Sequence, residues 1–185
     1  MLISKKKKII VWQPFKNYST SLLRYLANSK IFGEDRFSFV QGPVPYFDND
    51  AKEFHHLPSL GHTNWLPKSA TEYTKILPIR NPYSRVISQW KEGLKYDADL
   101  SFDTWFLIHS KQLIQAPVTK LYQYDKLLKV EDIEQELRNL SLFNEDYAFP
   151  HNNKSEHNDF ELSEKHKEII YHVHYSDFDE GGYDK

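Results

Sequence analysis

The chain has 185 residues, enough for one domain with a sizeable core and small for an enzyme that must hold a nucleotide and an acceptor together. Its formal net charge of −2 lacks the basic excess that neutralises phosphates, which argues against nucleic acid as a partner. The absence of cysteine excludes disulfides and thiolate metal sites, so we expect a cytoplasmic protein. No apolar run approaches the roughly 20 residues of a membrane span, so we expect no membrane partner either.

Apolar periodicity predicts a single α/β domain over residues 1–185. The β-rich runs lie at 9–13, 37–40, 76–80 and 118–122, and the helical patterns at about 19–29, 82–96, 102–112, 131–140 and 163–175. This alternation favours a parallel β-sheet flanked by helices. We expect Lys5 to Lys8 to be a solvated lead-in that keeps the first strand from pairing with neighbours. Pro78 removes a ladder donor, so its strand is expected to be irregular or to end early.

The first strand leads into a turn that concentrates cationic and hydroxyl side chains. Lys16 stands ahead of Ser19, Thr20 and Ser21, which open a helix with core-facing leucines. Free backbone N–H groups and the helix dipole favour an anion at such a helix start. The glycines of an ATP-type phosphate loop are absent, which disfavours a kinase or ATPase. Taken alone, the segment is equally well interpreted as a capped helix start.

A second turn of the same kind follows the strand at 76–80, with the sequence Arg80-Asn81-Pro82-Tyr83-Ser84-Arg85. We call the turn at 16–21 the first corner and this turn the second corner. Asn81 is suited to cap the next helix, and Pro82 suits its first turn. Ser88 shares a helical face with Ser84, because residues four apart are neighbours. Arg80 and Ser88 together provide the fork and the hydroxyl that a phosphate monoester needs. The alternative is that the two arginines form surface ion pairs. Two such corners indicate one ligand with two separated phosphate-like groups.

In order and spacing, these corners resemble those of the PAPS-dependent sulfotransferases, whose donor is 3'-phosphoadenosine-5'-phosphosulfate. The family's loop, Pro-Lys-x-Gly-x-Thr/Ser-Ser, aligns its lysine with Lys16. Its Arg-Asp-Pro-x-x-Arg motif, with a serine eight residues after the first arginine, aligns with Arg80 and Ser88. In this chain Tyr18 replaces the glycine, Phe15 falls where proline is expected, and an asparagine replaces the frequent aspartate. The resemblance implies a P-loop NTPase-like sulfotransferase fold.

The resemblance also implies a donor site. Its phosphosulfate-binding residues are Lys16, Asn17, Tyr18, Ser19, Thr20 and Ser21, and its 3'-phosphate-binding residues are Arg80 and Ser88. Lys16 is implied at the bridging oxygen, where a cation stabilises the charge that builds on the leaving phosphate. PAPS is then the co-substrate, adenosine 3',5'-bisphosphate is the product, and no metal is expected.

A more diffuse likeness covers the second half of the chain. Residues 118–125 look like the family's strand ending in an acidic residue before a capping helix. Residues 149–155, and the ending Tyr175-Ser176-Asp177-Phe178 with Tyr183, resemble patterns of the carbohydrate-type branch. The branch implies a sugar acceptor. Lys154 is placed to reach the donor from its loop, and a solvated loop lysine is an equal alternative.

An acceptor hydroxyl that attacks sulfur needs a general base, and histidine or a carboxylate is the usual choice. The irregular segment from about 41 to 75 contains Glu53, His55, His56 and His62. His62 is ranked first as the catalytic base, because the resemblance puts a histidine or glutamate near this position. Glu92, on the helix of the second corner, is a rival. No His-Glu-x-x-His spacing occurs, which gives no support to a metal site.

The sequence therefore predicts a sulfotransferase that moves the sulfuryl group from PAPS to a hydroxyl or amine of a small-molecule or carbohydrate acceptor. Two alternatives stay open. One is a small nucleotide-dependent phosphotransferase that uses the corner at 16–21, and the other is a non-catalytic nucleotide-binding domain. The sequence does not name the acceptor or the oligomeric state.

Overall fold

The computed structural model describes residues 2–4, 6–14, 16–17, 19–29, 71–109, 117–150 and 160–185. The elements of this part are, in chain order, β1 (Leu2–Ser4), β2 (Ile9–Val11), α1 (Ser19–Asn28), β3 (Thr74–Ile79), α2 (Pro82–Gly93), α3 (Phe102–His109), α4 (Val118–Leu121), β4 (Lys126–Lys129), α5 (Ile133–Asn139), α6 (Glu164–Val173) and α7 (Tyr175–Gly181). The strand expected at 37–40 lies outside the described residues.

One sheet with the strand order β1-β2-β3-β4 forms the centre of the fold. Strands β2, β3 and β4 are parallel, which confirms the predicted α/β class, and β1 is antiparallel to β2. The lysine segment does not keep β2 from pairing, because Ile3 pairs with Ile10 across this hairpin. Exposed lysines form the turn of the hairpin, and Lys8 closes it with a φ of 55°.

Strand β3 passes through Pro78 in regular pairing with β4, so the expectation of an irregular or shortened strand is wrong. The Trp12 N–H donates to the Ile76 carbonyl at 2.9 Å, and the pairing register of β2 with β3 ends at Ile76. Alternate residues of a parallel strand bond to the same neighbour. The nitrogen of Pro78 therefore faces β2, one step beyond the last hydrogen bond between β2 and β3. The pairing of these two strands loses no N–H donor at this position.

Residues 118–122 were predicted as a strand, and this prediction is wrong because residues 118–121 form the short helix α4 and Tyr122 ends it. The Asp177 carboxylate accepts hydrogen bonds from the backbone N–H groups of Val118 and Thr119, both at 2.9 Å. A carboxylate at the first N–H groups of a helix stabilises that helix. This cap comes from α7 and outweighs the strand preference of a β-branched segment. The strand follows a few residues later, as β4.

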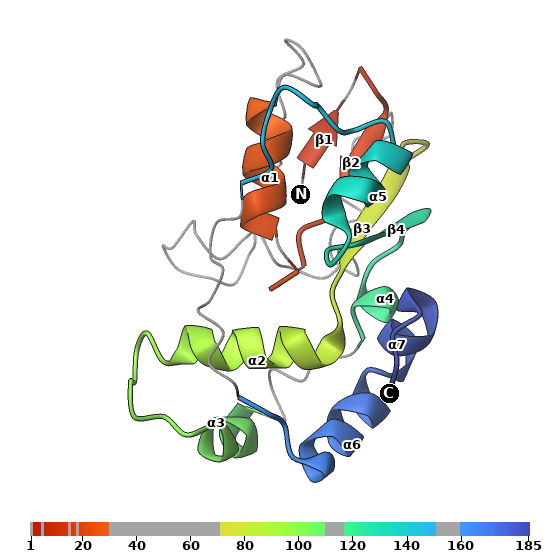
Figure 1. The fold of residues 1–185 in the computed structure, drawn as a ribbon. Coiled ribbons are helices and arrows are strands. Elements are labelled where there is room, and N and C mark those ends of the chain that lie inside the picture. Colours follow the sequence, from red (N-terminus) through yellow and green to blue (C-terminus); the bar gives the residue numbers. More distant parts are fainter. Residues whose placement is uncertain are drawn as a thin grey trace, which may run out of the picture.

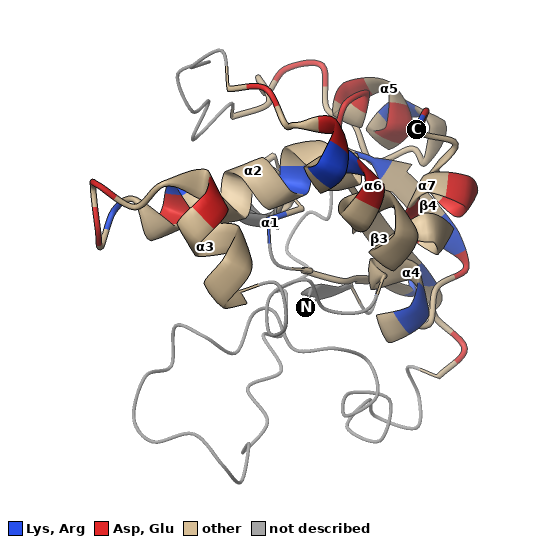
Figure 2. Ribbon diagram, turned by 90° about the horizontal axis from the view of Figure 1, so that it is seen from below, with Lys and Arg blue, Asp and Glu red and all other residues tan. Residues whose placement is uncertain are grey.

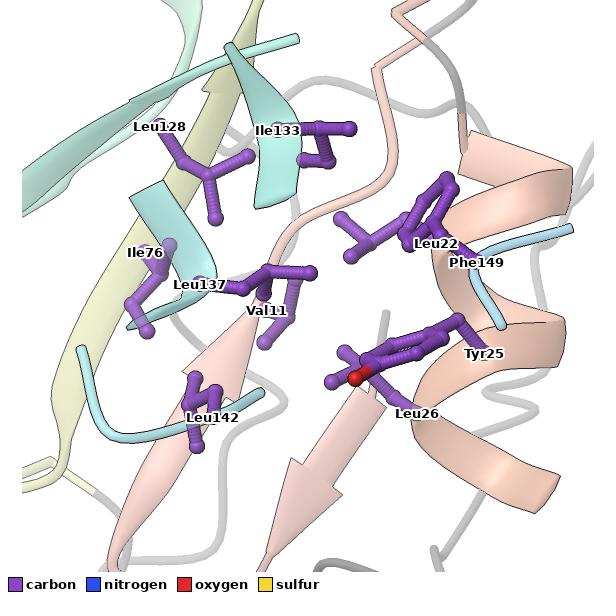
Figure 3. Close-up of a cluster of buried hydrophobic side chains, with 10 residues drawn as sticks. All are labelled: Val11, Leu22, Tyr25, Leu26, Ile76, Leu128, Ile133, Leu137, Leu142 and Phe149. Carbon is purple, nitrogen blue, oxygen red and sulfur yellow. The ribbon is translucent and has the colours of Figure 1, made fainter. Parts of the chain in front are cut away.

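The helices bury the sheet on both faces (Figure 1). On one face, α1 and α5 pack over β2, β3 and β4, and Figure 3 shows Leu22, Tyr25 and Leu26 of α1 directed toward Val11 of β2. On the other face, Trp12 and Leu77 pack against α4. A third apolar cluster joins α2, α3, α6 and α7. In Figure 1, α2 crosses the molecule below the carboxyl end of β3.

Candidate functional site

The two predicted corners leave the same edge of the sheet. Strands β2 and β3 are parallel neighbours, with Val11 paired to Ile76. The segment with Lys16 follows the carboxyl end of β2, and Arg80 directly follows that of β3. Carboxyl ends of adjacent parallel strands are the usual place for a ligand in an open α/β sheet. The backbone therefore starts both corners at the same edge of the sheet.

The first corner is a tight turn that feeds a helix. The Asn17 N–H donates to the Pro14 carbonyl at 3.3 Å, and Lys16 has a φ of 59°. This left-handed conformation costs a side-chain-bearing residue about 1 kcal/mol. Helix α1 begins at Ser19, as predicted, so the hydroxyl run forms its first turn. Tyr18 lies outside the described residues.

Lys16 makes a long-range ion pair with the second helix. Its Nζ lies 2.5 Å from Oε2 of Glu92, on the last turn of α2, and the two side chains are 20% and 29% exposed. The same oxygen also accepts from Lys95 Nζ at 2.8 Å. Burial by itself raises the pKa of Glu92, but the hydrogen bonds from Lys16 and Lys95 outweigh burial and hold that pKa below its ordinary value. Glu92 is therefore an ionised partner of Lys16.

Asn17 adds an unpaired amide to the same turn. Its side chain is 0% exposed, and neither Nδ2 nor Oδ1 has a hydrogen-bond partner in the described part of the chain. A buried amide without partners costs roughly 1–3 kcal/mol. Such a group is one that a polar ligand would satisfy. The sequence selected Asn17 only through its place in the loop.

The second corner is built around a capped helix. Asn81 Oδ1 accepts from the N–H groups of Tyr83 at 2.9 Å and Ser84 at 3.3 Å, and Pro82 occupies the first turn, as predicted. Arg80 is half-buried at the end of β3. The cap fixes the direction in which the chain turns from the strand into α2.

Ser88 lies between the two corners along α2. It is four residues before Glu92, so both lie on one face of the helix, about 6 Å apart along its axis. Because Lys16 contacts Glu92, the first corner meets the face of α2 that carries Ser88. The structure thus brings Lys16 to the helix that begins at the Arg80 corner.

Arg85, the second arginine of the motif, does not form a surface pair. Its side chain is 3% exposed, and Nη2 lies 2.9 Å from Oδ2 of Asp177 and 2.9 Å from Nδ1 of His174. Burial, with a smaller contribution from Arg85, lowers the pKa of His174 to about 3 against the opposing effect of Asp177, so His174 is neutral. This buried group joins α2 to the end of α6 and to α7.

Several predicted residues lie outside the described part of the chain. They are Glu53, His55, His56, His62 and Lys154. Two residues beside Arg80 escaped the sequence prediction of the site: Glu131 and Tyr183 bond to the turn that carries it. The tail pattern singled out Tyr183 without giving it a role, and no sequence signal marked Glu131.

The described elements carry lysine and arginine dispersed among aspartate and glutamate (Figure 2). Within the described ranges, no group of three or more His, Asp or Glu residues is arranged to hold a metal ion. No helix of the described residues has both the length and the apolar character that crossing a membrane requires.

Comparison with known proteins identifies the class to which this fold and these corners belong. A sequence model of the Sulfotransferase family matches residues 1–120, a span that includes both corners. The chain is therefore a member of the sulfotransferase family, as the sequence predicted. Neither a search of curated proteins nor a search of solved structures gave a match. The tail that resembles the carbohydrate-type branch lies beyond the matched span.

Proposed function

We propose that the protein binds PAPS across the carboxyl ends of β2 and β3 and transfers its sulfuryl group to an acceptor hydroxyl or amine. The observation that carries the proposal is the 2.5 Å pair between Lys16 and Glu92, which docks the phosphosulfate corner onto the helix of the 3'-phosphate corner. One nucleotide then spans from Lys16 and the start of α1 to Arg80 and Ser88.

The chemistry is an in-line displacement at sulfur. The acceptor oxygen or nitrogen forms a bond to sulfur while the bond from sulfur to the bridging oxygen breaks, and its electron pair stays on the 5'-phosphate. Lys16 stabilises that developing charge as an ammonium ion. Such a loose transition state needs positioning and charge stabilisation more than covalent help from the protein. The acceptor proton passes to a general base.

Glu92 is a poor choice for that base. Its two lysine partners lower its pKa, and a lower pKa makes the carboxylate a weaker proton acceptor. In our proposal Glu92 instead holds Lys16 until the donor replaces it as the partner of the ammonium group. His62 stays the first candidate for the base, with Glu53, His55 and His56 as alternatives.

We propose a carbohydrate as the acceptor. The terminal pattern with Asp177 and Tyr183 supports a carbohydrate acceptor through its resemblance to that branch. The lack of cysteine supports a reducing compartment such as the cytoplasm. We also propose that residues 1–185 form a single domain.

A ligand-dependent unfolding experiment tests the donor. Adenosine 3',5'-bisphosphate at a hundred times its dissociation constant is expected to stabilise the fold by about 2.7 kcal/mol. For a chain of this length, the increase corresponds to a rise in Tm of roughly 5–10 °C. A larger shift with ATP and Mg²⁺ would contradict the proposal and favour a phosphotransferase. Binding of the bisphosphate without any turnover of PAPS would favour a non-catalytic nucleotide-binding domain.

A further inference from the structure

The turn that carries Arg80 is held on both sides by residues from the second half of the chain. Before it, the Ile79 carbonyl accepts a hydrogen bond from the Tyr183 hydroxyl at 3.2 Å. After it, the Asn81 N–H donates to Oε1 of Glu131 at 2.8 Å. The same Tyr183 hydroxyl lies 2.8 Å from Oε2 of Glu131, so its hydrogen is shared between the two acceptors. Tyr183 and Glu131 thus form one bridge across the turn.

The end of α7 delivers Tyr183 to this place. Gly182 has a φ of 59°, and the Tyr183 N–H donates to the Phe178 carbonyl at 2.9 Å, which turns the chain back on the helix. A Cβ on Gly181 would lie 2.5 Å from the Tyr183 ring and 3.3 Å from the Ile79 side chain. The ring therefore packs over Gly181, where only a glycine leaves room for it, and its hydroxyl reaches the last residue of β3.

The bridge is anchored and keeps its hydrogen. Helix α7 is tied to α2 by the buried pair of Asp177 with Arg85, so Tyr183 and the Arg80 turn belong to one braced unit. Burial, and after it the charge of Glu131, raises the pKa of Tyr183 far above its ordinary range. The phenol stays a hydrogen-bond donor at any working pH.

We propose that Tyr183 and Glu131 are positioning residues for Arg80, and that their bridge sets the affinity of the protein for the 3'-phosphate of its nucleotide. A guanidinium binds a phosphate through a fixed fork, so the backbone that carries it must be fixed as well. The inference rests on the proposed function and deepens it. Both residues lie outside the span that the family model matches.

Isothermal titration with two ligands tests the bridge. Adenosine 3',5'-bisphosphate probes the site, and adenosine 5'-monophosphate, which lacks the 3'-phosphate, is the reference ligand. Removing the hydroxyl in Tyr183→Phe is expected to weaken bisphosphate binding by about three- to tenfold and to leave monophosphate binding unchanged. Tyr171→Phe is the matched control, because the ring of Tyr171 packs on Phe178 in the same helix pair. This control is expected to bind both ligands as the unchanged protein does.

A second variant, Glu131→Ala, removes the other half of the bridge and is expected to give the same ligand-dependent loss. The double variant is expected to lose less than the product of the two single losses, because both act through one contact. Normal bisphosphate affinity in Tyr183→Phe, or an equal loss for both ligands, would overturn the positioning role. If the unchanged protein bound both ligands equally, the proposed function itself would fail, which is a distinguishable result.

Discussion

The two corners differ in how firmly they are held. The Arg80 corner is fixed by the Asn81 cap, by the Glu131 and Tyr183 bridge, and by the buried Arg85 behind it. The Lys16 corner carries the buried Asn17 amide, which has no hydrogen-bond partner among the described residues, and a lysine in a left-handed conformation. In the proposed function, the two ends of the donor are therefore bound in different ways. Under that proposal, the 3'-phosphate end of the donor meets a preorganised site, whereas the sulfuryl end meets Lys16, whose partner Glu92 the donor must replace.

The largest effect on stability is expected from breaking the buried ion pair that holds α7 to α2 behind the Arg80 corner. Asp177→Asn leaves Arg85 buried without its counter-charge, and we expect a loss of about 3–5 kcal/mol in the free energy of unfolding. Urea denaturation measures it. Glu180→Gln on the same helix is the control, because its pair with Lys120 is exposed and worth at most about 1 kcal/mol. Equal losses for the two variants would show that the buried pair does not brace α7.

The next largest effect is expected at the Lys16 corner. Lys16→Ala is expected to slow the transfer reaction, measured as formation of adenosine 3',5'-bisphosphate from PAPS, by about 10²–10³-fold. The charge that builds on the leaving phosphate is then not stabilised. The affinity for the product should change much less. Lys95→Ala, which removes the other partner of Glu92, serves as the control and should retain turnover. A normal rate in Lys16→Ala would remove it from the mechanism.

His174 predicts a pH dependence of stability. Its pKa in the folded protein is about 3 against an ordinary 6.5, so between these values the unfolded chain binds a proton that the folded protein excludes. The free energy of unfolding should therefore fall as the pH drops below 6.5, by about 1.4 kcal/mol per pH unit. His174→Asn should reduce the loss between pH 7 and pH 5 by roughly 2 kcal/mol. His172→Asn, at an exposed position, is the control, and a slope unchanged in His174→Asn would contradict the prediction.

The smallest effect concerns the partner of Lys16. Glu92→Gln removes a negative charge beside the proposed anion site and removes the ion pair that joins Lys16 to α2. We expect binding of adenosine 3',5'-bisphosphate to become about two- to fivefold tighter, most clearly at low salt. Titration calorimetry against Glu164→Gln, an exposed carboxylate paired with Lys167, measures it. Weaker binding would mean that Glu92 supports the site instead of competing with the donor.

The sequence predicted the fold where local pattern and tertiary packing agree. Asn81 and Pro82 mark the start of α2 by local chemistry, and the structure confirms it. The sequence prediction failed at α4, because the carboxylate that caps this helix is that of Asp177, 59 residues from Val118 along the chain. It also missed β1, a three-residue strand followed directly by lysines.

The candidate site divides in the same way. Residue types, order and spacing led to the prediction of Lys16, Arg80 and Ser88 as donor-site residues, because the motif lies within short segments. The contact of Lys16 with Glu92 joins residues 76 apart in the sequence, and the Glu131 hydrogen bond to the Arg80 turn joins residues 50 apart. Sequence periodicity does not predict such pairs, because they depend on which strands become neighbours in the sheet.

Calorimetric binding of three nucleotides tests the central claim most directly. If one nucleotide is held at both charged ends, adenosine 3',5'-bisphosphate binds at least about tenfold more tightly than either the 3'- or the 5'-monophosphate, since each end adds a charge-assisted contact. Arg80→Ala should then bind the bisphosphate no better than the 5'-monophosphate. A monophosphate that binds as tightly as the bisphosphate would contradict the two-ended site.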